Sequence, residues 1–282
     1  MKIHKFSIIL AIPFFILLVI IGYFVYLDPR GSSLLWALLP LTPLMLIYLF
    51  SPQIDYWWLE RNPVELDAPI KSMLNRTNPR YQSLNNDQRQ LFDNRLTLFS
   101  SGREFIGKGG ESDNIDVPYD IKMMISQIPV TMTLGRQHVG FKNWERVVLY
   151  KHPFPTPMNK FLHTMETHAE DGVVILSLEH VEAALMQKGY HYDVAWHAYA
   201  EAFIKDNPKE NYPDLPTNIW ESIVKISPQS REQILATLGF KAIDPMPVLI
   251  NMYFNYKDKF AKELPEIKRD FDKIFIQRKQ IV

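Results

Sequence analysis

The chain has 282 residues, of which 31 are basic and 31 acidic, and it contains no cysteine. Zero formal net charge and the lack of a nucleic-acid-binding motif argue against a DNA or RNA partner, and the lack of cysteine excludes disulfide bonds and thiolate metal sites. The length suits a membrane segment followed by one domain, or two small domains.

Two long apolar segments open the chain. Residues 6–27 and 31–54 carry no charged side chain, and each exceeds the ~18 residues that indicate a membrane-spanning helix. We therefore predict a transmembrane helical hairpin over residues 1–54, with spans at about 6–27 and 33–50. A cleaved signal peptide is the alternative, but the apolar run is too long for one, and it lacks a small-residue cleavage site.

The basic residues near the N-terminus predict the orientation of this hairpin. Lys2 and Lys5 favour the cytoplasmic side, and two spans would return the chain to that side. Arg30 in the outer turn opposes this bias and is partly offset by Asp28. We expect an integral membrane protein whose soluble part faces the cytoplasm.

The soluble part predicts an α+β fold that is mainly helical. Residues 55–80 are interpreted as a polar connector and residues 81–282 as the folded domain, with a helix capped near Asn85 and ending at about Phe99. Residues 103–110 are glycine-rich but lack the phosphate-loop pattern, so we interpret them as a turn. Further helices are expected at about 118–134, 178–187, 192–205, 219–238 in two pieces, and 245–278 with a break near Pro265.

Two short β-branched runs predict a small sheet. Residues 147–150 and 172–177 are bounded by residues that break secondary structure and are interpreted as strands. Residues 151–171 between them form a loop rich in proline and histidine that could fold as a hairpin. Two strands with helices before and after them indicate α+β rather than a doubly wound sheet.

The predicted helix at 192–205 carries an altered metallopeptidase motif. A zinc-peptidase helix contains His-Glu-x-x-His, in which two histidines bind zinc and the glutamate is the general base. Here His197 occupies the first ligand position, Ala198 the base position and Glu201 the second ligand position. A histidine four residues before a glutamate also occurs by chance on many helices, so the surrounding sequence must decide.

That surrounding sequence resembles the Mlc titration factor A-like family of glucose-regulated zinc metallopeptidases. The resemblance covers about residues 80–270 and depends on the order and spacing of short motifs. They are Tyr81-x-x-Leu84, Arg89-x-x-Phe92-x-x-Arg95-x-x-x-Phe99, Phe105-Ile106-Gly107-x-Gly109, Trp144-x-x-Val147-x-x-Tyr150, and Gly172 to Ser177 followed by Val181.

The resemblance implies a zincin-like domain, peptidase or aminopeptidase activity, one zinc ion and a soluble repressor as partner. It also implies a bacterial protein, so the membrane is expected to be the cytoplasmic (inner) membrane. The family's third zinc ligand is a glutamate on a later helix, and an ungapped count places Phe254 there. A shifted alignment could supply Asp258 or Glu263 instead.

We therefore expect no catalytic residue and no cofactor, with His197 and Glu201 as a vestigial metal site. Loss of a general base alone lowers a rate by roughly 10²–10⁴. The leading hypothesis is a catalytically inactive module that binds a protein or peptide. The alternatives are an active zinc peptidase with rearranged ligands, and a protein whose hairpin is itself the surface that binds a partner.

Other histidines were weighed as ligands. His163-x-x-Glu166-x-His168 could bind a metal from the loop, but it matches no recognised ligand spacing. His191 lies out of register with His197 and is interpreted as a surface residue. His197 and Glu201 could also form a direct hydrogen-bonded pair across one helical turn.

Overall fold

The computed structural model describes residues 5–27, 32–109, 114–137, 139–187 and 189–276. It divides the chain into two compact units, Met1–Glu65 and Leu66–Val282, which are described separately. Lys2, Asp28, Arg30 and the end of the last predicted helix lie outside the described residues.

One helix of the N-terminal unit is long and apolar enough to cross a membrane alone. Helix α1 (Phe6–Leu27) has 22 residues, and its apolar side chains are largely exposed. At 1.5 Å per residue it spans about 33 Å, close to the hydrocarbon thickness of a bilayer. The first predicted span is therefore present as a continuous helix.

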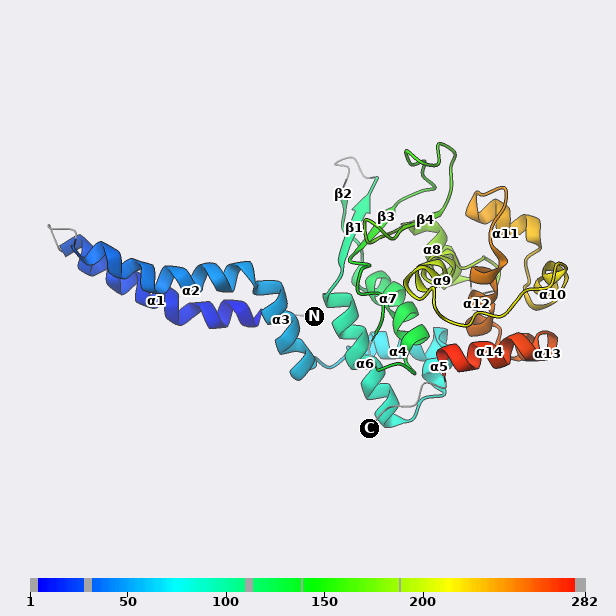
Figure 1. Ribbon diagram of the computed structural model, residues 1–282, viewed down its shortest axis with the longest axis horizontal. Coiled ribbons are helices and arrows are strands. Elements are labelled where there is room, and N and C mark those ends of the chain that lie inside the picture. The colour runs from blue at the N-terminus through cyan, green and yellow to red at the C-terminus, as the bar shows by residue number, and fades with distance from the viewer. Residues whose placement is uncertain (1–4, 28–31, 110–113, 138, 188, 277–282) are drawn as a thin grey trace. The chain divides into compact units, whose positions relative to one another are not determined.

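The second predicted span is not a single straight helix. It consists of a 3₁₀ turn, η1 (Ser32–Ala37), and α2 (Leu38–Leu49), which lies beside α1 (Figure 1). The helical stretch then bends by 69° into α3 (Ser51–Arg61). Pro52 explains the bend, because proline has no N–H to continue the hydrogen-bond ladder and restricts the residue before it.

Polar and aromatic contacts join α3 to the start of α1. The backbone N–H and the hydroxyl of Ser7 both donate to the carboxylate of Asp55, at 2.7 and 2.9 Å. The rings of Phe6 and Trp58 stack with centroids 4.0 Å apart. The prediction of a hairpin with spans at about 6–27 and 33–50 is corrected to one full span, plus a bent helix pair that passes the length test only when its two helices are taken together.

The second unit is mostly helical. The helical expectations for residues 85–99, 118–134, 178–187 and 192–205 are confirmed to within two or three residues. Asn85 caps its helix through a capping box with Gln88. The helices are α4 (Ala68–Thr77), α5 (Pro79–Gln82), α6 (Asn86–Ser101), α7 (Tyr119–Thr133), α8 (Leu178–Met186), α9 (Val194–Asp206), α10 (Ile219–Ile226), α11 (Arg231–Leu238), α12 (Pro245–Asn255), α13 (Lys257–Glu263) and α14 (Pro265–Phe275).

A mixed sheet in the order β2-β1-β3-β5-β4 completes this unit. The strands are β1 (Glu104–Lys108), β2 (Asn114–Ile115), β3 (Arg146–Tyr150), β4 (Met165–His168) and β5 (Val173–Ser177). The central strands β1, β3 and β5 are parallel, whereas β2 and β4 pair antiparallel at the two edges. The predicted strands are confirmed as β3 and β5. The turn expected at 103–110 is wrong, because β1 occupies most of it.

Helix α9 lies at the centre of the second unit. It packs against β4 and β5 of the sheet and against α7, α8 and α12 (Figure 1). Four alanines in this helix allow the neighbouring elements to approach closely. The hydrophobic core around it is drawn from residues between Leu66 and Phe275.

Candidate functional site

The start of α9 is fixed by its cap and by α12. The carboxylate of Asp193 accepts hydrogen bonds from the backbone N–H groups of Ala195 and Trp196, both at 3.1 Å. The Asn251 amide of α12 donates to the Asp193 carbonyl at 3.0 Å. The altered motif therefore sits on a helix whose position is set by the core.

His197 is buried in this core and is only 1% exposed. Its Nδ1 shares a hydrogen bond of 2.7 Å with the hydroxyl of Tyr192. Burial lowers the pKa of His197 to about 4, although the charges of Glu201 and Asp244 act in the opposite direction. The imidazole is therefore neutral at pH 7.

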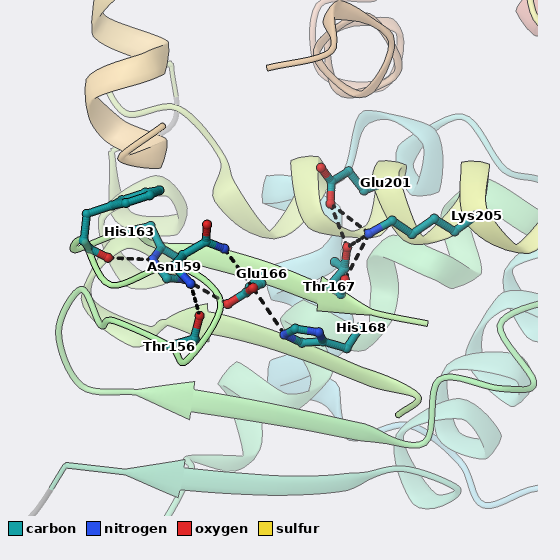
Figure 2. A network of polar contacts seen from close by, with 9 residues as sticks. Thr156, Asn159, His163, Glu166, Thr167, His168, Glu201 and Lys205 are labelled. Atoms are coloured by element: carbon teal, nitrogen blue, oxygen red, sulfur yellow. Dashed lines mark hydrogen bonds and ion pairs between the residues drawn. The ribbon is translucent and has the colours of Figure 1, made fainter. Parts of the chain in front are cut away.

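Glu201 is turned toward β4 (Figure 2). Its Oε2 accepts a hydrogen bond of 2.7 Å from the Thr167 hydroxyl and lies 3.7 Å from Lys205 Nζ. The Lys205 ammonium also donates to the Thr167 carbonyl at 3.0 Å. No hydrogen bond joins His197 to Glu201 among the described residues, so the direct pair considered from the sequence is not formed.

The general-base position is closed. Ala198 is 0% exposed and belongs to the hydrophobic core. Phe254, at the expected position of the third ligand, stacks on Trp196 with ring centroids 5.0 Å apart. An aromatic contact therefore occupies the place where the family pattern requires a carboxylate.

A family model for the glucose-regulated metallopeptidases M90 matches residues 56–222, which is more than half of the chain and includes the altered motif. The chain belongs to the M90 family. The family resemblance expected from the sequence is thus confirmed, although the match begins and ends earlier than residues 80–270. A search of curated proteins finds no match to this chain.

The M90 family implies a zinc ion, and the residues present do not fit one. His197 keeps the form of a ligand, since a hydrogen bond to Nδ1 also orients zinc-binding histidines. Glu201, however, is engaged by Thr167 and Lys205. Within the described ranges, no group of three or more His, Cys, Asp or Glu side chains is placed to hold a metal ion, so Asp258 and Glu263 do not complete a site.

The loop residues weighed as ligands in this M90 protein form a polar cluster instead (Figure 2). His163 Nε2 lies 3.1 Å from Glu166 Oε2, and His168 Nε2 lies 3.3 Å from Glu166 Oε1. His163 Nδ1 faces the Phe161 carbonyl at 2.9 Å, so both ring nitrogens of this buried histidine face acceptors. Asn159 Nδ2 donates to Glu166 Oε1 at 2.9 Å.

The carboxylate of Glu166 is the centre of this cluster. Burial alone would raise the pKa of Glu166, but a hydrogen bond from Thr156 and the nearby rings of His168 and His163 together lower it. The group is therefore ionised at neutral pH. Its partners come from the loop before β4 and from β4 itself, so it ties the loop to the sheet.

Replacing Glu166 by alanine should destabilise the second unit by about 3 kcal/mol, because the change leaves buried partners without their acceptor. Urea unfolding followed by tryptophan fluorescence would measure the loss. Glu170→Ala, which changes an exposed glutamate two residues beyond β4, is the matched control. A loss no larger than that of the control would contradict this role of Glu166.

A small pocket lies on another side of α9. It has about 40 Å³ of internal space and is bordered by Tyr192, Trp196 and His191 from the α9 region, by Asn251 and Asn255 of α12, and by Tyr256, which follows α12. Neither His197 nor Glu201 borders it. The volume is well below the ~300 Å³ of the smallest drug-sized pockets, so it suits one side chain rather than a whole cofactor.

Sequence reasoning located the motif but missed the residues that surround it. Tyr192 hydrogen-bonds His197 and Thr167 hydrogen-bonds Glu201, and the charge of Asp244 partly offsets the effect of burial on the pKa of His197. Only Tyr192 lies near the motif in sequence, where its aromatic character was noted as core packing. Thr167 and Asp244 reach the site through the fold, and no local pattern marks them.

Proposed function

We propose that this M90 protein is a membrane-anchored, catalytically inactive relative of the zinc peptidases that acts by binding a protein or peptide. The observation that carries the proposal is the base position, where a buried alanine replaces the glutamate. The remaining acid of the motif, Glu201, is held by Thr167 and Lys205. A zincin-like frame whose chemistry has been removed suits binding.

The N-terminal unit supports membrane anchoring. Helix α1 can span a bilayer, and the pair α2 and α3 can supply a second crossing if its bend is accommodated. We infer a bacterial inner-membrane protein with its second unit in the cytoplasm. Lys5, just before α1, favours a cytoplasmic N-terminus, and two crossings return the chain to that side.

The partner class follows from the surface of the second unit. The pocket beside α9 is small, partly aromatic and bordered by two asparagines, a combination that suits a side chain of a protein or peptide. The balanced charge of the chain does not favour nucleic acid as the partner. No cofactor is required for this role.

Zinc content tests the proposal. The purified full-length chain, dialysed without chelator, should contain far less than one zinc per chain by elemental analysis, and His197→Ala should not change the value. About one zinc per chain that disappears in His197→Ala would instead support the alternative of an active peptidase with rearranged ligands.

A further inference from the structure

The loop between β3 and β4 extends beyond the sheet of the second unit (Figure 1) and exposes large apolar side chains. Met158 is 76% exposed, Leu162 64% and Phe161 47%. Grouped apolar side chains of this size on a projecting loop mark a surface that contacts another molecule or a membrane. These three residues are called the apolar tip.

The loop holds a defined conformation. Phe154 and His163 form an antiparallel bridge at its base, with N–H to carbonyl distances of 3.0 and 3.1 Å. At its end, the Thr156 N–H donates to the Asn159 carbonyl at 2.8 Å, and the Asn159 N–H donates to the Thr156 hydroxyl at 3.0 Å. Three prolines in the loop further restrict its backbone.

The Glu166 cluster fixes the inner side of this loop (Figure 2). Glu166 accepts a hydrogen bond from Asn159 and contacts His163, so the polar side chains point inward to β4. Phe161 packs edge-to-face on Phe240 with ring centroids 5.6 Å apart. These contacts hold the apolar tip in an outward-facing conformation. The tip therefore loses little conformational entropy when it binds.

The charged residues near the apolar tip indicate which kind of surface the tip contacts. No acidic residue occurs in the sequence between Lys151 and Met165, and exposed Lys160 lies within the tip. At the base of the loop, Glu179 of α8 pairs with His152, next to Lys151. Apolar side chains with an interspersed lysine are a combination that inserts into the headgroup region of an anionic membrane. A tethered domain also meets its bilayer at a high effective concentration, so weak insertion is enough.

We propose that the apolar tip of residues Met158, Phe161 and Leu162, with Lys160, is a second membrane contact that inserts into an anionic lipid surface. The inference rests on the proposed anchoring by α1 and adds that the second unit docks on the same membrane. Docking would restrict which face of α9 and its pocket a partner can reach.

The absence of cysteine makes a site-specific test direct. Three single-cysteine variants of the full chain, Ile16→Cys in α1, Leu162→Cys in the tip and Val224→Cys in α10, are labelled with an environment-sensitive fluorophore. All three positions are exposed on the protein. Each is reconstituted into vesicles of zwitterionic lipid or of zwitterionic with anionic lipid, with and without a lipid-borne quencher.

The expected result is quenching at position 16 in both lipids, quenching with a blue shift at 162 in anionic vesicles, and no quenching at 224. Lys160→Ala should lower the ratio of membrane-inserted to free molecules, measured with the label at position 162, by about fivefold. Quenching at 16 without quenching at 162 would overturn the second contact and leave the anchoring intact.

The remaining outcomes are equally decisive. No quenching at 16 would overturn the anchoring itself. A blue shift at 162 without quenching by lipid would show a protein contact in place of a membrane contact. Equal quenching at 162 and 224 would show that the tip has no special affinity for lipid, and either result overturns the proposal.

Discussion

Replacing Ala198 by glutamate, which restores the zincin base, is expected to destabilise the second unit by about 3–5 kcal/mol rather than to restore catalysis. Ala198 is 0% exposed within the hydrophobic core. A carboxylate there would lose its hydration with no cation to compensate, and the larger side chain would also overfill the packing. Urea unfolding of residues 66–282, which contain the whole core, measures the effect.

Two controls separate charge from volume at this position. Ala198→Gln has nearly the same size as the glutamate variant without its charge, and Ala198→Ser adds only a hydroxyl. The glutamate variant should recover part of its deficit relative to glutamine as the pH falls, because its carboxyl then becomes neutral. A loss below about 1 kcal/mol for Ala198→Glu would mean that the base position still opens to a cleft.

Acidification should cost the second unit about 2–3 kcal/mol of unfolding free energy through His197 alone between pH 7 and pH 4.5. The folded pKa of His197 is about 4, below its ordinary value of 6.5, because the ring is buried. The unfolded chain therefore binds a proton that the folded chain rejects. The stability contributed by neutral His197 is complete above pH 6.5 and is lost as the pH falls toward 4.

Comparison with His197→Gln isolates this effect from that of the carboxylates. Glutamine can still hydrogen-bond the Tyr192 hydroxyl but does not titrate. Urea unfolding at pH 7 and pH 4.5 should show a smaller drop for the variant, by the amount that His197 contributes. An equal drop in unfolding free energy between pH 7 and pH 4.5 for the two proteins would contradict a neutral, buried His197.

Local signals in the sequence predicted most helices of the fold. Asn85 with Gln88 forms a capping box, and Pro228 lies between α10 and α11. A few neighbouring residues therefore determine where these helices begin and end. Strands β3 and β5 are apolar, β-branched and buried, and were visible for the same reason.

Strands β1 and β4 were missed because distant partners define them. Strand β1 is glycine-containing and half-exposed, and it exists through its parallel pairing with β3, some forty residues later in the chain. Strand β4 pairs antiparallel with β5. The sequence allowed a hairpin within residues 151–171 but did not predict this strand. The bend after α2 was also missed, because hydropathy measures composition and does not sense one proline.

In the candidate site, too, the positions of the motif residues could be predicted from the sequence, whereas their hydrogen-bond partners could not. The positions of His197, Ala198 and Glu201 on one helix followed from spacing alone, and the structure places all three on α9. The hydrogen bonds that separate Glu201 from His197 come from β4, α9 and the segment before α9, so pairwise spacing within the motif could not reveal them.

Peptide hydrolysis by the full-length chain, with zinc supplied, tests the central claim most directly. A mixed library of peptides is incubated with the wild-type protein and with His197→Ala, and cleavage is read by mass spectrometry. The account predicts the same background for both proteins, with or without a chelator. Cleavage that the chelator stops and that His197→Ala lacks would contradict it.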